Sequence, residues 1–183
     1  MAQHLVFVAS MLQFLLAATF LIIPIVAYLY GDNAQRAAEA EVVEQGFPVR
    51  VLAQHRIRFA ESGVETLFPF AIAGCLATLA SLNLAGSEVG RIVSWIFQPI
   101  VLVGGGFITA GQVFSVQYIE SAFKKSGDTT LQSINVRAFV DAASGAFPAW
   151  LRYLVATRFV LATVGSLLVI ILLAVPSANA YFR

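Results

Sequence analysis

Four long apolar stretches alternate with polar segments along the chain, and this pattern predicts four transmembrane helices. A helix needs about 20 apolar residues to cross a hydrocarbon core of roughly 30 Å. The uncharged runs Leu5–Tyr30, Thr66–Ala85 and Ile92–Ile119 reach this length. The last run, Phe159–Val175, is shorter, and we extend it back to Leu151 because Arg side chains near a helix end can reach the lipid headgroups. The predicted spans are residues 5–30, 66–85, 92–119 and 151–175.

The composition supports an all-α integral membrane protein. Hydrophobic residues make up 59% of the 183 residues and charged residues only 11%, with a mean hydropathy of +0.83, whereas a soluble domain carries roughly 25% charged residues. The net charge of +1 gives no strong attraction for nucleic acid. The first apolar run follows "MAQH", which has no Lys or Arg, so we interpret it as a span and not as a signal peptide. We therefore expect a single four-span membrane domain over residues 1–183.

The distribution of Lys and Arg predicts the orientation of the spans. Most of these residues lie in the two long loops, residues 31–65 and 120–150, or next to them. The short hairpin between the second and third spans and the C-terminus contribute only Arg91 and Arg183. Because cytoplasmic loops carry the excess of Lys and Arg, we expect both loops in the cytoplasm and both termini outside. The simple excess of Lys and Arg on one side of the predicted spans favours a bacterial inner membrane as the location of the protein.

Both long loops contain patterns that predict short helices. Asp32 or Asn33 can cap a helix after the first span, and Pro48 suits the first position of a second short helix. In this second helix basic and apolar residues alternate, which predicts an interfacial helix at the inner leaflet; a polar helical hairpin in the cytoplasm is the alternative. The residues expected at the lipid headgroups are Arg50, Arg56, Arg58, Arg152 and Arg158.

The segments before the second and fourth spans resemble each other. "GFPVRVLAQHRIRF" (46–59) and "AFPAWLRYLVATRF" (146–159) share Phe-Pro near the start and Arg-Phe at the end. Each would lie between a cytoplasmic loop and an even-numbered span. This placement suggests a tandem repeat of two spans related by an axis along the membrane normal. Chance similarity in so apolar a sequence is the alternative.

The third span carries a face of small and polar residues. Its polar stripe falls within about 60° of the helical wheel, and glycines next to the stripe are spaced for close approach of another helix. The residues of this face are Ser94, Gln98, Gly104, Gly105, Gly106, Thr109, Ala110, Gly111 and Gln112. Lipid is a poor environment for polar groups, so the face is expected to contact a helix. A polar path for a solute, lined by Gln98, Thr109 and Gln112, is the alternative.

The remaining chemistry of the chain is sparse. His4 and His55 lie outside the apolar runs and Cys75 is the only cysteine, so we expect no metal site and no cofactor. Glu65 and Arg158 are placed to form an ion pair at the inner interface. Without a catalytic set of residues, we expect no enzyme.

The function expected from the sequence is that of an accessory or structural membrane subunit. Its partners would be the lipid bilayer and either other membrane subunits or further copies of itself, held through the small and polar face of the third span. A small oligomeric channel or transporter is the alternative.

Overall fold

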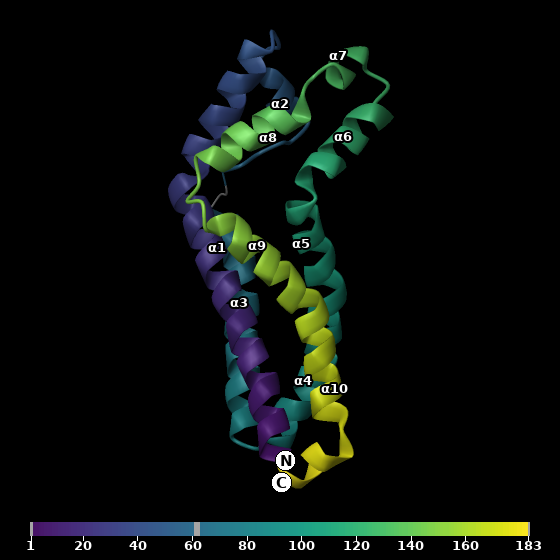
Figure 1. Cartoon of the computed structure of the whole chain (residues 1–183). Coiled ribbons are helices and arrows are strands. Elements are labelled where there is room, and N and C mark those ends of the chain that lie inside the picture. The colour runs from purple at the N-terminus through teal and green to yellow at the C-terminus, as the bar shows by residue number, and fades with distance from the viewer. Residues whose placement is uncertain (1, 61–62, 183) are drawn as a thin grey trace.

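The computed structural model describes residues 2–60 and 63–182, and every regular element in these two ranges is a helix. Figure 1 shows four long helical segments side by side, with both termini at one end and shorter helices at the other. The four segments are each long and apolar enough to cross a membrane. They are Ala2–Glu44, Gly63–Leu84, Glu88–Val113 and Leu151–Ala174. The predicted all-helical class and the four candidate spans are confirmed.

The first span does not end where its apolar run ends. Helix α1 (Ala2–Glu44) is a single helix of 43 residues that passes from the bundle into the group of shorter helices. The predicted cap at Asp32 or Asn33 is wrong, because Asn33 lies within the helix and its side chain accepts a hydrogen bond from Arg36 Nη2 at 2.8 Å. The residues after Gly31 are mostly strong helix formers, so the helix continues.

The second and third spans form an antiparallel hairpin. Helix α3 (Gly63–Leu84) is followed by a tight turn and by α4 (Glu88–Ile100), whose N-terminus is capped by the side chain of Ser87. Gly90 lies so close to α3 that a Cβ atom there would be 2.5 Å from Leu82 Cβ. The absence of a side chain at Gly90 therefore allows this close approach.

The third and fourth spans each contain one wide π-helical turn. The third runs through α4, η1 (Val101–Gly105) and α5 (Gly106–Val113), and the fourth through α9 (Leu151–Val160), η2 (Leu161–Gly165) and α10 (Ser166–Ala174). The predicted third span extended to Ile119, but α5 ends at Val113, and the helix axis changes at Phe114. A short 3₁₀-helix, η3 (Pro176–Ala180), follows the fourth span.

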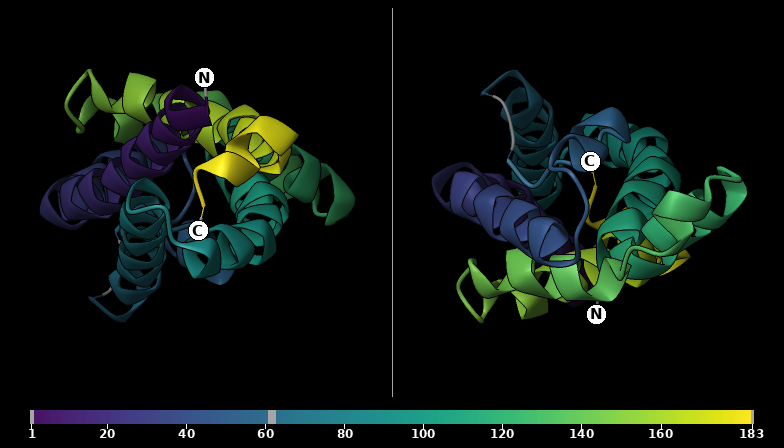
Figure 2. Two further views of the ribbon diagram at one scale, coloured as in Figure 1. Left: turned by 90° about the horizontal axis from the view of Figure 1, so that it is seen from below. Right: turned by 90° about the horizontal axis from the view of Figure 1, so that it is seen from above.

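The two long loops fold together into one unit, which we call the head. It contains the C-terminal part of α1, α2 (Arg50–Gln54), α6 (Ser115–Lys125), α7 (Thr129–Gln132) and α8 (Val136–Gly145). These helices surround an apolar core that includes Ala38, Leu52, Phe123 and Phe139. Figure 1 shows α8 lying across α1, and Figure 2 (right) shows the head from its outer side. The helical patterns of the two loops did not predict this shared core.

The two Phe-Pro segments have similar starts and different ends. In each, the amide three residues after the proline donates to the proline carbonyl, from Val51 and Leu151 respectively. In the first segment the short helix α2 ends at Gln54, and Arg56 adopts a positive φ of 54°. In the second segment α9 continues into the span. The resemblance thus covers a turn in the head, while the Arg-Phe ends differ in conformation.

Candidate functional site

A cluster of polar side chains joins all four spans near the end that carries the termini. Asn83 Nδ2 of α3 donates to Gln13 Oε1 of α1 at 3.0 Å and to Ser94 Oγ of α4 at 2.9 Å. Gln98 Nε2 of α4 donates to Ser166 Oγ of α10 at 2.9 Å. All five side chains are buried. The cluster therefore holds the helices together where apolar side chains alone would give no directional contact.

This end of the bundle is closed by the C-terminal segment. Arg91 Nε donates to the carbonyl oxygen of Leu173 at 3.0 Å, and its guanidinium carbon lies 4.6 Å from the ring centre of Trp95 and 5.2 Å from that of Phe182. Tyr181 Oη donates to the carbonyl oxygen of Leu84 at 2.5 Å. Figure 2 (left) shows the C-terminal segment, in yellow, at this end of the bundle.

An apolar layer separates the polar cluster from the other half of the bundle. It consists of Leu16 and Phe20 of α1, Leu76 of α3, Val101 of η1 and Ala162 of η2, all buried. The polar stripe predicted on the third span is interrupted here. Ser94 and Gln98 lie on one side of the layer, within the cluster, whereas Thr109 and Gln112 lie on the other.

A cavity of about 380 Å³ lies on the far side of this layer, between α1, α3, α4, η1, α5 and α9. Most of its wall is apolar. The side chains that form the apolar wall include Phe20, Phe68, Ile72, Phe97, Ile100 and Ile108. Its volume is at the lower end of the range for small-molecule sites.

One end of the cavity is polar. Arg158 of α9 lines this end, although only 4% of the residue is exposed. Its Nη2 donates to Gln112 Oε1 of α5, and its guanidinium carbon lies 5.4 Å from the ring centre of Phe20. Thr109 lines the same wall and donates its hydroxyl hydrogen bond to the carbonyl oxygen of Gly105 at 2.7 Å. The buried guanidinium of Arg158 thus lies with Thr109, Gln112 and Glu65 at the polar end of a cavity whose remaining wall is apolar.

The predicted pair of Glu65 and Arg158 lines this one cavity from two helices. Glu65 Oε1 also lies 3.8 Å from Arg58 Nη1, and the side chains of Glu65 and Arg58 are both more than half exposed. An exposed pair of this kind contributes little to stability. Its importance is that it places a second guanidinium near the mouth of the cavity.

The small residues of the third span have different environments. Gly106 is buried, and a Cβ atom there would be 3.2 Å from Thr163 Cγ2 of η2; Gly105 faces Ala162 of the same helix. Among the described residues, an added Cβ at Gly104 or Gly111 would meet nothing within 4 Å. Ser94, Gln98, Gly106 and Thr109 are buried within their own chain and are not free to contact a partner, whereas Gln112 is exposed. Ala110 is partly buried beside them.

The π-turn η1 shapes the cavity. It contributes Val101, Gly104 and Gly105 to the lining, and it packs against η2 of the fourth span. Wide turns of this type occur frequently at functional sites. Pro99, in the last turn of α4, lacks the amide hydrogen that a regular helix needs and lies two residues before the start of η1. It is the sequence signal for this irregular stretch.

Four of the five Arg residues predicted at the lipid headgroups are exposed. Arg50, Arg56 and Arg58 lie in the head or in the segment that leaves it, and Arg152 lies at the start of α9. Arg152 stacks on Tyr153, with its guanidinium carbon 4.6 Å from the ring centre. Arg158, the fifth, is the buried residue of the cavity. Leu52 and Val51 of the predicted interfacial helix point into the core of the head.

Three residues of the polar cluster were not among the predicted site residues: Gln13, Asn83 and Ser166. Each is a polar residue within or at the edge of an apolar run, which is the signal that could have identified it.

Within residues 2–60 and 63–182, no group of three or more His, Cys, Asp and Glu side chains is placed to bind a metal. Comparison of the chain with protein-family models, curated proteins and solved structures gives no match.

Proposed function

We propose that the chain is a non-enzymatic integral membrane protein that holds an amphiphilic molecule in the cavity beside Arg158. In this proposal the four long helices cross a bacterial inner membrane, the head lies in the cytoplasm and both termini lie outside. The excess of Lys and Arg in the head and beside it supports this orientation. The cavity then opens in the half of the bundle nearer the cytoplasm.

The observation that carries the proposal is the combination of apolar walls with a buried guanidinium at one end. Ligand sites are typically apolar cavities with a few convergent polar groups that fix orientation. An ionisable group among membrane helices is costly, which makes it a functional candidate by default. A molecule with an apolar body and a polar head matches both parts of this cavity.

A second candidate function is the accessory or self-assembling subunit predicted from the sequence. One observation favours it: Gly104 and Gly111 of the third span leave room for another helix. Thr109 and Gln112 could line a polar path, but Gln98, the third residue of that path, is held beyond the apolar layer. The channel alternative is therefore the less supported of the two.

The test uses two glycine substitutions in the third span. In Gly104→Leu the new side chain enters the cavity, whereas Gly111 does not line it and Gly111→Leu serves as the matched control. Each protein is extracted in mild detergent, and bound amphiphiles are counted by native mass spectrometry. We expect the parent and Gly111→Leu to retain one amphiphile per chain and Gly104→Leu to lose at least about tenfold in occupancy, which corresponds to 1.4 kcal/mol.

The same measurement separates the two candidate functions. Equal retention by Gly104→Leu and the parent protein would show that the cavity is not the binding site. Loss of a larger assembly in both glycine variants, without loss of a bound amphiphile, would instead support the subunit hypothesis.

A further inference from the structure

We infer that the ligand of the cavity has an uncharged, oxygen-bearing head group, such as a hydroxyl or a carbonyl. We also infer that it enters from the hydrocarbon of the bilayer, through a side opening between α3 and α5. This inference rests on the proposed function and adds to it the charge of the head group and the route of entry.

The charges at the polar end of the cavity are balanced. Among the described lining residues, the charged side chains are those of Glu65 and Arg158, one carboxylate and one guanidinium. Both also interact within the chain: Arg158 Nη2 donates to Gln112 Oε1, and Glu65 Oε1 lies 3.8 Å from Arg58 Nη1. The side chain of Arg58 is 56% exposed, so the surrounding ions screen its charge. The described lining therefore has no net formal charge.

A charged head group gains little from such a lining. An ion that leaves water for an apolar cavity loses its solvation, and only a well-placed opposite charge can compensate for the loss. An incoming ion of either sign would reach its opposite charge only by disturbing the interactions that Glu65 and Arg158 already make. An uncharged polar group loses less on burial and needs only a hydrogen bond. The balance of charges therefore favours an uncharged head group.

The hydrogen-bonding groups of α5 match a head-group oxygen. Gln112 Oε1 accepts from Arg158, and its Nε2 carries two N–H donors that no hydrogen bond among the described residues uses. Thr109 Oγ1 donates to the carbonyl oxygen of Gly105 at 2.7 Å and keeps its lone pairs as acceptors. Thr109 and Gln112 both line the cavity. A carbonyl or hydroxyl oxygen can thus accept from Gln112, and a hydroxyl can also donate to Thr109.

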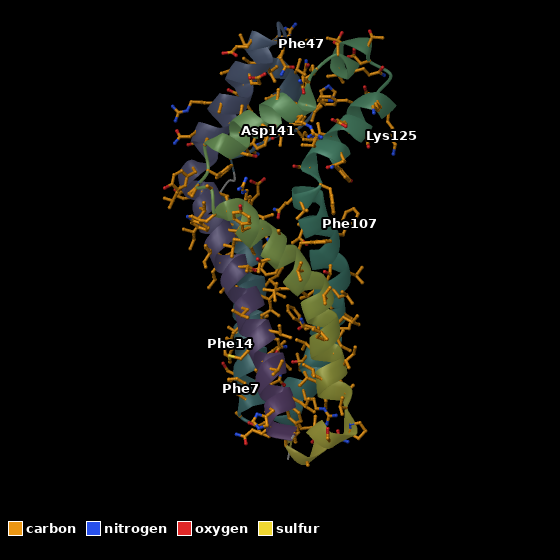
Figure 3. The ribbon with its side chains drawn as sticks, viewed as in Figure 1. Phe7, Phe14, Phe47, Phe107, Lys125 and Asp141 are labelled. Atoms are coloured by element: carbon orange, nitrogen blue, oxygen red, sulfur yellow. The ribbon has the colours of Figure 1, made fainter. Side chains whose placement is uncertain are left out.

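The route of entry follows from where the cavity meets the surface. Three lining side chains are strongly exposed: Phe68 on α3 by 63%, Ile100 at the end of α4 by 61%, and Ile108 on α5 by 52%. They lie on the second and third candidate spans, so in the proposed orientation this opening faces the hydrocarbon of the bilayer. Figure 3 shows the neighbouring Phe107 also pointing outward from α5. A molecule dissolved in the membrane can reach the cavity from the side.

The experiment compares compounds that share a hexadecyl or hexadecanoyl chain and differ in the head group. Delipidated full-length protein in detergent is titrated with hexadecanol, 1-monopalmitoylglycerol, hexadecyl sulfate and hexadecyltrimethylammonium, in competition with a fluorescent fatty alcohol. The last two compounds stay charged at every working pH, and the monoglyceride controls for the bulk of the head group. We expect both uncharged compounds to bind at least about tenfold more tightly than either ion. Hexadecane, which has no head group, should bind more weakly than hexadecanol.

Variants that unbalance the lining should change the preference in opposite directions. Glu65→Gln removes the carboxylate and should increase the affinity for hexadecyl sulfate, relative to hexadecanol, by at least about tenfold. Arg158→Gln removes the guanidinium and should favour hexadecyltrimethylammonium instead. The double variant Glu65→Gln/Arg158→Gln has no net charge again and should regain the preference of the parent protein. If Arg158→Gln does not fold, Glu65→Gln, which changes an exposed side chain, still tests the balance.

The route is tested by a pair of tryptophan substitutions on α5. Ile108 lines the cavity at its opening, whereas the adjacent Phe107 is exposed but does not line it. In lipid vesicles, Ile108→Trp should slow the exchange of the fluorescent fatty alcohol several-fold, and the control Phe107→Trp should leave the rate unchanged. Equal exchange rates in the two variants would overturn entry from the side.

The outcomes separate this inference from the proposed function. Equal affinity of the parent protein for hexadecanol and the two ions would overturn the uncharged head group and leave the amphiphile site intact. Weak binding of the monoglyceride together with both ions would show selection by size and would also overturn it. An unchanged preference in Glu65→Gln would show that the balance of charges does not set the selectivity. Failure of every compound to bind would overturn the proposed function itself.

Discussion

A glutamine in the middle of an apolar helix is explained here by its partners on other helices. Gln13 Nε2 donates to Ser94 Oγ and to Gln98 Oε1, both at 3.3 Å, and Gln13 Oε1 accepts from Asn83. Hydrogen bonds link these buried side chains and fix the register of the helices that carry them, while Asn83 Oδ1 accepts no hydrogen bond from the described residues. The sequence showed the polar stripe of α4 but could not show which helices face it, because hydropathy carries no information about partners.

Replacing Gln13 by leucine should destabilise the bundle. The change removes partners from Asn83, Ser94 and Gln98, and a buried polar group left without a partner costs about 1–3 kcal/mol. We expect a lower midpoint of thermal unfolding in detergent for Gln13→Leu. The control is Gln3→Leu, at an exposed position of the same helix, which should unfold at nearly the parent temperature. Equal stability of the two variants would mean that the cluster contributes no net stabilisation.

At the scale of elements, apolar length predicted the four candidate spans well. It failed where a helix continues without an apolar pattern, as in α1 beyond Tyr30, and where helical geometry changes inside a uniform run, as in η1. Polar residues after Gly31 are compatible with a helix in water or in lipid headgroups, so composition alone does not mark the end of α1. The core of the head was missed for a different reason: it joins α1 and α2 to α6, α7 and α8, which are far apart in the sequence.

The hairpin between α3 and α4 makes a prediction about Gly90. A methyl group there would lie 2.5 Å from Leu82 Cβ and 3.1 Å from the Leu82 carbonyl carbon. Because part of this contact is backbone, the two helices must separate, and Gly90→Ala should lower stability by about 1–3 kcal/mol, as overpacking does. Gly74→Ala is the control, because among the described residues an added Cβ there meets nothing within 4 Å. It should be neutral or stabilising by up to about 1 kcal/mol, through helix propensity. Chemical denaturation of both variants in mixed micelles gives the comparison.

At the scale of the whole molecule, the chain has an apolar bundle and a head with its own core. The head core is built from the two long loops, and the bundle contains the polar cluster, the apolar layer and the cavity in that order along its axis. Of the candidate site, the sequence identified Thr109, Gln112, Arg158 and Glu65 as residues of interest. It could not show that three helices, α3, α5 and α9, bring them to one cavity.

The proposed orientation predicts which surfaces a membrane-impermeant reagent can reach. In a Cys75→Ser background, a cysteine at Ala85, in the turn between α3 and α4, should react with an impermeant maleimide on intact cells. A cysteine at Lys125, at the end of α6 in the head, should react only after the cells are opened (Figure 3). The reverse pattern would invert the orientation, and labelling of both sites from outside would exclude four crossings.

The continuity of α1 has a mechanical consequence. A helix of 43 residues is roughly 65 Å long, about twice the hydrocarbon thickness. Pro24 of this helix lines the cavity, while Ala34, Ala38 and Val42 of the same helix are built into the core of the head. The segment from Pro24 to Glu44 therefore acts as a lever arm of roughly 30 Å. A tilt of about ten degrees at the cavity would move the far end of this arm by about 5 Å, so the head is the part of the molecule in which a small displacement at the cavity becomes largest.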